Sequence, residues 1–133
     1  NILFISAGQA FTPYYAQVHV GAAKAGIDNL MRNLAMEWGR FGIRSNSIAP
    51  GPIEGTEGMR RLAPGDEAFH ARFKRAIPLG RYGTVDDIGQ TAVFLASPLA
   101  AYVTGTRVVV DGGQNLPGSG LFGHMIRQAM AAS

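Results

Sequence analysis

Cysteine is absent from this chain of 133 residues, which excludes disulfides, thiolate-bound metals and a cysteine nucleophile; we expect no metal site. No apolar run approaches the roughly 18 residues that span a bilayer, and Asn1–Ser6 lacks the basic start of a signal peptide. Charged residues make up only 16%, and a net charge of +3 without a dense basic stripe does not indicate nucleic acid. The sequence therefore predicts neither a membrane nor a nucleic-acid partner, whereas small anions such as phosphates remain compatible with it.

Three short apolar segments predict the strands of one globular domain, in a chain that is 47% hydrophobic. Asn1–Ser6 is apolar without alternation, which indicates a strand buried on both faces of a parallel sheet. Ile43–Ile48 is a second strand, ended by the Pro50-Gly51-Pro52 turn. Thr106–Val110 is β-branched and predicts a third buried strand.

The longest predicted helix spans Val18–Phe41 and contains Lys24 among small residues. Its apolar residues recur at three- and four-residue steps, which predicts one buried stripe. That stripe comprises Ile27, Leu30, Met31, Leu34 and Trp38. Two interpretations of Lys24 stay open at this point: a surface lysine with a buried stem, or a cation positioned at a cofactor.

Further helices are expected at Thr56–Leu62 and Asp66–Ala76, and after Thr84, a good N-cap. This last helix should turn Ile88, Ala92, Leu95 and Ala96 inward, and the tail from Pro117 should be weakly helical. The order β-α-β-(α-α)-α-β is that of the second half of a doubly wound α/β sheet. A chain that starts inside a strand is expected to have lost its beginning.

Four segments resemble the short-chain dehydrogenase/reductase family, and the likeness covers residues 1–114. They are Asn46–Ile53, Leu95–Ser97, Tyr102–Gly105 and Val110–Gly113. The resemblance implies a Rossmann-like fold that binds NAD(P). The glycine-rich GxxxGxG turn of that family does not occur here, so residues 1–133 are interpreted as the C-terminal portion of a single NAD(P)-binding domain.

The usual catalytic pair of that family is missing. Lys24 matches the family's helix lysine, but the tyrosine position four residues earlier holds Val20, and the serine position holds Ala7. Gln17 stands where enoyl-ACP reductases place their tyrosine, and Gln9 where mitochondrial 2,4-dienoyl-CoA reductases place theirs. The standard acid–base machinery for carbonyls and alcohols is therefore absent.

One branch of the family shares this departure, the peroxisomal type of 2,4-dienoyl-CoA reductases. Three stretches of the chain resemble it: Val18–Ala25, Pro50–Leu62 and Ala96–Ala100. The resemblance implies NADPH-dependent reduction of 2,4-dienoyl-CoA thioesters, with a catalytic water held by Lys24 and Asp111. Two alternatives remain: a reductase of another enone or enoyl thioester, or a catalytically silent dinucleotide-binding protein. NADH is not excluded as the cofactor.

The resemblance also assigns binding residues. The expected cofactor-binding residues are Lys24, Pro50, Gly51, Pro52, Ile53 and Thr56. The expected residues for an acyl-CoA substrate are His19, Tyr15, Arg60 and Arg61. Each has a plainer alternative: Asp111 as a turn residue, Thr56 as an N-cap, His19 as a structural residue, and the arginines as a solvated face. Tyr14 and Tyr15 could line the acyl channel or donate a proton.

Assembly and location are further expectations. Members of the family are usually dimers or tetramers, and the slim faces of the long helix favour a homotetramer. The C-terminal Ala-Ala-Ser is not a peroxisomal address, so a cytoplasmic protein is expected.

Overall fold

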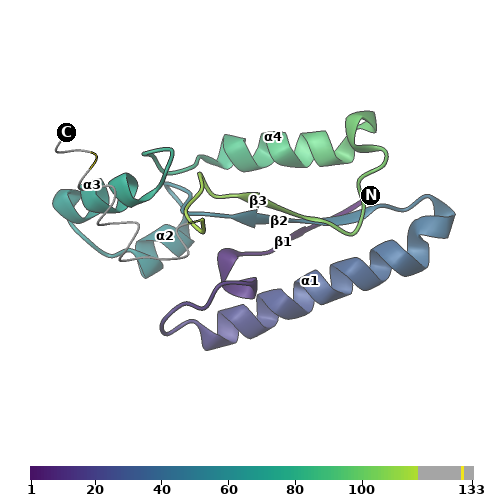
Figure 1. The fold of residues 1–133 in the computed structure, drawn as a ribbon, viewed down its shortest axis with the longest axis horizontal. Coiled ribbons are helices and arrows are strands. Elements are labelled where there is room, and N and C mark those ends of the chain that lie inside the picture. Colours follow the sequence, from purple (N-terminus) through teal and green to yellow (C-terminus); the bar gives the residue numbers. More distant parts are fainter. Residues whose placement is uncertain (117–129, 131–133) are drawn as a thin grey trace.

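The computed structural model describes residues 1–116 and Met130, and its centre is a parallel sheet of three strands. The strands are β1 (Ile2–Ile5), β2 (Ser45–Pro50) and β3 (Arg107–Val110), with β2 in the middle. All three run the same way, so their carboxyl ends lie at one edge of the sheet, on the left of Figure 1.

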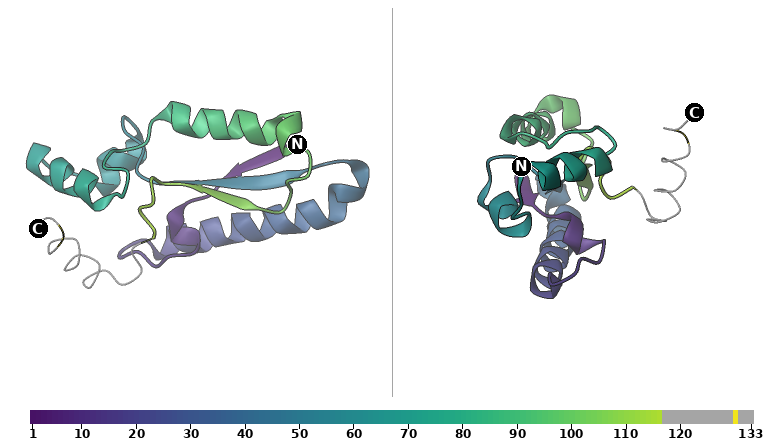
Figure 2. Two further views of the ribbon diagram at one scale, coloured as in Figure 1. Left: turned by 45° about the horizontal axis from the view of Figure 1, so that its top comes forward. Right: turned by 90° about the vertical axis from the view of Figure 1, so that its left-hand side faces the viewer.

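Helices cover both faces of this sheet. α1 (Val18–Trp38) lies against one face and α4 (Val85–Ala96) against the other (Figure 1 and Figure 2). α2 (Glu57–Leu62) and α3 (Glu67–Ala76) lie beyond the carboxyl end of β2 (Figure 1). This arrangement confirms the predicted α/β fold with a parallel sheet and the predicted order of elements.

The helix boundaries follow local signals in the sequence. A short 3-10 turn, Gly39–Phe41, continues α1, and the turn ends at Gly42 with φ of 72°, a left-handed conformation that favours glycine. α4 begins with a capping box: the Asp87 N–H donates to the Thr84 hydroxyl, and the Thr84 N–H donates to the Asp87 carboxylate. Hydrogen bonds from Arg81 and from Thr84 hold the pKa of Asp87 well below its usual value.

The main core forms where α4 packs on β2. Ile48 of β2, Leu95 of α4 and Ala100 are fully buried together. Ile88 and Ala92 pack against them as expected, but Ala96 is exposed, which corrects the predicted inward face. Ala96 is the last residue of α4, and the buried contacts at this end of the helix are made by Leu95 and Ala100 instead.

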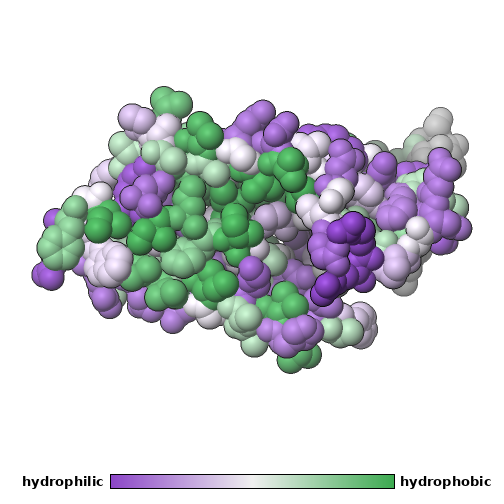
Figure 3. Space-filling view, turned by 180° about the vertical axis from the view of Figure 1, so that it is seen from behind, coloured by the Kyte–Doolittle hydropathy of each residue, from purple (hydrophilic) through white to green (hydrophobic). Residues whose placement is uncertain are grey.

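The outer strands are less buried than predicted. All of β2 except Pro50 is buried, whereas Ile5 is 50% exposed and Val109 is 43% exposed. β1 and β3 are the outer strands of the described sheet, so each has a neighbour on one side only. β1 lies at the rear of Figure 1, and the rear view shows hydrophobic side chains across the middle of the molecule (Figure 3).

The buried stripe of α1 also differs from the prediction. Met31 is fully buried as expected, but Leu30 and Trp38 are exposed, and an aspartate, Asp28, is 1% exposed. The Asp28 carboxylate accepts hydrogen bonds from Ser47 of β2 at 2.9 Å and from Arg107 of β3 at 2.7 Å. A charged group thus lies on the side of α1 that faces the sheet. Its burial is possible because Arg107 of β3 compensates the charge.

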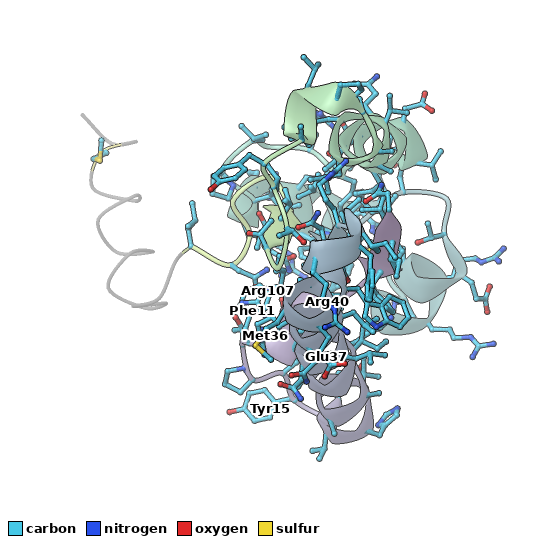
Figure 4. The ribbon with its side chains drawn as sticks, turned by 90° about the vertical axis from the view of Figure 1, so that its right-hand side faces the viewer. Phe11, Tyr15, Met36, Glu37, Arg40 and Arg107 are labelled. Atoms are coloured by element: carbon cyan, nitrogen blue, oxygen red, sulfur yellow. The ribbon has the colours of Figure 1, made fainter. Side chains whose placement is uncertain are left out.

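Arg107 also has an aromatic neighbour. Its guanidinium carbon lies 4.0 Å from the centre of the Phe11 ring, in the loop before α1 (Figure 4). This contact joins the loop after β1 to β3. Within the described part of the chain, no helix is long and apolar enough to cross a membrane. The predicted weak helix of the tail lies almost entirely outside the described residues.

Candidate active site

A cavity of about 1290 Å³ opens at the carboxyl edge of the sheet. Its walls come from the loops after β1 and β2 and from helices α2 and α3. Ligands of open parallel sheets bind at this edge, because the loops that leave neighbouring strands diverge there and leave a crevice. The cavity is therefore the candidate active site.

One wall contains four of the predicted cofactor-binding residues: Pro50, Gly51, Pro52 and Ile53. Backbone hydrogen bonds fix this wall in place. The Gly83 N–H donates to the Pro52 carbonyl at 2.9 Å, and the Glu54 N–H donates to the Gly83 carbonyl at 2.9 Å. The loop is thus held against the segment before α4 by backbone hydrogen bonds.

Gly51 lies where β2 and β3 end side by side. A Cβ atom at this position would lie 2.6 Å from the Cα atom of Asp111 and 2.7 Å from its Cβ atom. Backbone atoms cannot move aside as a flexible side chain can, so only glycine fits here. This close approach sets Asp111 directly beside the predicted cofactor loop.

Thr56 lines the cavity and is the N-cap of α2. Its hydroxyl donates to the Ile53 carbonyl at 2.8 Å and accepts from the Met59 N–H at 3.3 Å. The N-cap interpretation is thereby confirmed, and the role of Thr56 toward a cofactor stays a prediction. Because the hydroxyl proton is already donated to Ile53, Thr56 can only accept a further hydrogen bond in this geometry.

Lys24 lies on α1 next to the end of β1. Its Nζ donates a hydrogen bond to the Ile5 carbonyl at 2.7 Å. Ile5 and the following Ser6 and Ala7 line the cavity. Lys24 is therefore bonded to a strand whose last residue lines the cavity, and its role toward a cofactor stays a prediction.

Asp111 follows β3 and holds the turn after it. One carboxylate oxygen accepts from the Gly113 N–H at 2.8 Å. The other accepts from the backbone N–H of Asn115 at 2.9 Å and from its side-chain amide at 2.8 Å. The turn role is confirmed, and among the described residues no ion pair joins Asp111 to Lys24. The shared catalytic role of these two residues stays a prediction.

Tyr14 lies in the loop before α1 and lines the cavity. Its hydroxyl donates to the side-chain oxygen of Asn115 at 2.9 Å. Burial raises the pKa of Tyr14, and the negative charge of Asp111 raises it further. The loop after β1 and the turn after β3 are thus joined at the cavity by polar side chains. Asn115, which holds the cavity-lining Tyr14, is a residue that the sequence alone did not indicate.

The predicted substrate residues do not all reach the cavity. Tyr15 and Arg61 line it, whereas His19 is exposed and, like Arg60, is not part of the described lining. Tyr15 projects from the surface near the start of α1, fully exposed (Figure 4). Both arginines form ion pairs with Glu57, at 2.7 Å for Arg61. These exposed pairs agree with the solvated-face alternative.

Comparisons with known proteins place this chain in a family. A family model described as enoyl-(acyl carrier protein) reductase matches residues 1–115. The crystal structure of a short-chain dehydrogenase from Bacillus anthracis aligns with a TM-score of 0.77 at 42% identity, covering 89% of this chain and 45% of that one. The chain belongs to the short-chain dehydrogenase/reductase family. The family resemblance seen in the sequence is confirmed.

Two further relatives bear on the chemistry of this family member. The peroxisomal 2,4-dienoyl-CoA reductase of Saccharomyces cerevisiae is 51% identical over 124 residues, 93% of this chain and 41% of that protein. An NADPH-bound short-chain oxidoreductase from Pseudomonas aeruginosa PAO1, described as containing an atypical catalytic center, has a TM-score of 0.74 and 37% identity. It is matched over 84% of this chain and 44% of its own. The chain thus spans about two fifths of the length of its yeast relative.

Proposed function

We propose that the protein to which this chain belongs is an NADPH-dependent reductase of 2,4-dienoyl-CoA thioesters. Support comes from the name of the yeast relative, which describes a 2,4-dienoyl-CoA reductase that produces (3E)-enoyl-CoA. The observation that carries the proposal is that the family's tyrosine and serine positions hold Val20 and Ala7, with Ala7 in the cavity wall. Lys24 keeps its place and donates to the carbonyl of Ile5, which also lines the cavity.

This departure suits reduction at carbon. Adding a hydride to the terminal alkene carbon of a conjugated diene thioester moves the electrons to the thioester oxygen and leaves a dienolate. One proton then goes to carbon, and one O–H bond of water breaks as the C–H bond forms. The remaining hydroxide takes a proton from bulk solvent. The family's tyrosine, paired with the helix lysine, protonates an alkoxide oxygen. Since no alkoxide forms in this reaction, such a phenol is not required.

The residues at the cavity fit a nicotinamide dinucleotide. An ammonium has three N–H donors, and Lys24 uses one of them on the Ile5 carbonyl, which leaves two for ribose hydroxyls. Pro50–Ile53 would hold the nicotinamide end, with Thr56 accepting a hydrogen bond beside it. The bound cofactor would supply the hydride. The NADPH in the Pseudomonas relative favours NADPH over NADH.

An acyl-CoA substrate would extend from this site toward α2 and α3. Apolar side chains of Met59, Phe69 and Phe73 line that part of the cavity, together with Arg61 and Arg72. Apolar walls suit an acyl chain, and guanidinium groups at the rim suit the phosphates of CoA. Tyr15, Arg60 and His19 lie at or outside the rim, so we assign them no direct part in binding the acyl chain.

The test is NADPH consumption by the full-length protein, followed at the nicotinamide absorbance. Turnover should be fastest with a 2,4-dienoyl-CoA, compared with a 2-enoyl-CoA, a free enone and a simple ketone. Faster turnover of the enone or the enoyl thioester would favour the second candidate function. NADPH binding without turnover of any of the four would identify a silent dinucleotide-binding protein.

Location is the second part of the proposal. The name of the yeast relative favours the peroxisome over the cytoplasmic location expected at first. Fluorescence microscopy of the tagged full-length protein in its own cells tests this, and a diffuse signal would restore the cytoplasmic expectation.

A further inference from the structure

Three polar side chains form a chain of hydrogen bonds beside the cavity. The Asp111 carboxylate accepts from the side-chain amide of Asn115 at 2.8 Å, and the side-chain oxygen of Asn115 accepts from the Tyr14 hydroxyl at 2.9 Å. Tyr14 and Asn115 are 101 positions apart in the sequence. Only the fold brings them together, at the carboxyl ends of β1 and β3.

The donor and acceptor in each of these hydrogen bonds follow from the charge of Asp111. An ionised carboxylate can only accept hydrogen bonds, so the NH₂ group of Asn115 must face Asp111. The amide oxygen of Asn115 then faces Tyr14, and the phenol must donate its proton to it. The Tyr14 oxygen is therefore left with its lone pairs, ready to accept a hydrogen bond.

Glycine makes room for the contact. A Cβ atom at Gly8 would lie 3.2 Å from the Tyr14 hydroxyl oxygen and 3.0 Å from the Asn115 amide nitrogen. Without a Cβ, buried Gly8 lies close to this hydrogen bond, and its neighbours Ala7 and Gln9 line the cavity wall. The raised pKa of Tyr14 keeps the phenol protonated near neutral pH, as a donor to Asn115 requires.

We infer that Tyr14, held by Asn115 and Asp111, is a positioning residue that orients the water molecule whose proton goes to the substrate carbon. This inference rests on the proposed function. A water that donates one hydrogen to the Tyr14 oxygen has its other hydrogen free to point at the dienolate. Asp111 thus acts on the water through Asn115 and Tyr14. The hydroxyl of Tyr14 comes from the loop before α1, whereas the family's tyrosine position on α1 holds Val20.

The first experiment separates the two halves of the reaction in the full-length protein. Single-turnover measurements follow nicotinamide oxidation and product formation by absorbance, the second as loss of the dienolate's own absorbance, because a quenching acid would itself protonate the dienolate. In Tyr14→Phe, oxidation should keep its rate, while product formation should slow by roughly 10²-fold, the lower end of the range for general acid–base groups. The matched control is Tyr102→Phe, which removes the hydroxyl of a fully exposed tyrosine between α4 and β3.

Product formation as fast in Tyr14→Phe as in Tyr102→Phe overturns the inference. Equal slowing of both steps also overturns it, because a purely structural role would affect hydride transfer too. If Tyr14→Phe does not fold, Asn115→Ala replaces it. Removing the acceptor frees the Tyr14 proton to turn toward the water, so the same selective slowing is expected, and unchanged product formation contradicts the inference.

The second experiment needs no catalysis. Phenol ionisation in the ligand-free protein is followed by ultraviolet absorbance, and the Tyr14 titration is the difference between wild type and Tyr14→Phe. Asp111→Asn should lower the pKa of Tyr14, because the carboxylate charge raises it. If the pKa of Tyr14 is the same in Asp111→Asn as in the wild type, the proposed link between Asp111 and Tyr14 is contradicted. If the wild type fails to reduce dienoyl-CoA, the proposed function fails instead, and this titration still tests the hydrogen-bonded chain.

Discussion

Asp28→Asn should destabilise the protein through one buried ion pair. Asp28 of α1 is 1% exposed, and its two carboxylate oxygens accept from Arg107 of β3 at 2.7 Å and from Ser47 of β2 at 2.9 Å. The carboxylate therefore joins the helix to two strands. An amide of the same shape can still bond the Ser47 hydroxyl, which can also accept, but it carries no charge to compensate the Arg107 guanidinium.

The loss of unfolding free energy depends on how well the Arg107 charge is solvated once Asp28 is replaced. Removing one partner of a fully buried pair costs about 3–5 kcal/mol, because the other charge is left without compensation. The Arg107 side chain is 28% exposed and lies over the Phe11 ring, so part of its charge stays solvated. The loss should approach that of a hydrogen bond to a charged group, and we expect about 2 kcal/mol in the free energy of unfolding.

The effect should depend on pH. Burial alone would raise the pKa of Asp28, but the hydrogen bonds from Arg107 and Ser47 outweigh it and hold the pKa below its ordinary value. The unfolded chain therefore binds this proton more readily than the folded one. The stabilisation is complete above the unfolded pKa of about 4 and is lost as the pH falls through the lowered pKa. The difference between wild type and Asp28→Asn should shrink over that acid range.

The assay is urea unfolding of the full-length protein, monitored by circular dichroism at neutral and acid pH. Glu57→Gln is the control, because it removes a carboxylate from exposed ion pairs with Arg60 and Arg61, which contribute little. A loss in Asp28→Asn no larger than in the control, or one that does not change with pH, would refute the reasoning.

Three more predictions concern activity and assembly. With Val20 and Ala7 in place of the family's tyrosine and serine, simple ketones should be reduced roughly 10²-fold more slowly than a dienoyl-CoA; equal rates would sink the assignment. Gly51→Ala should weaken NADPH binding measured by fluorescence titration, because the new methyl group would overlap Asp111 and displace the cofactor loop; an unchanged dissociation constant speaks against that geometry. The full-length protein should be a homotetramer, and light scattering that gives a monomeric mass would contradict this.

Local features of the sequence were sufficient for the order of the elements. Thr84 and Asp87 lie three residues apart and form the capping box of α4 whatever the rest of the chain does. The Pro50-Gly51-Pro52 turn ends β2 because proline cannot donate to a strand ladder. Such signals act over a few residues, which is why the amino-acid sequence suffices to locate the strands, the helices and the family segments.

Burial and the polar contacts of the site depended on partners far away in the chain. Nothing near Asp28 indicates that it is buried, because the cation that compensates it, Arg107, belongs to β3. In the same way, Asn115 holds the cavity-lining Tyr14 only because the fold brings the two together. The sequence by itself determined which residues could form helices, strands and turns, since these follow from backbone preferences and hydrophobic period. The tertiary structure alone decided which polar groups meet, since hydrogen bonds and ion pairs require contact within a few ångströms between segments that the chain itself keeps far apart.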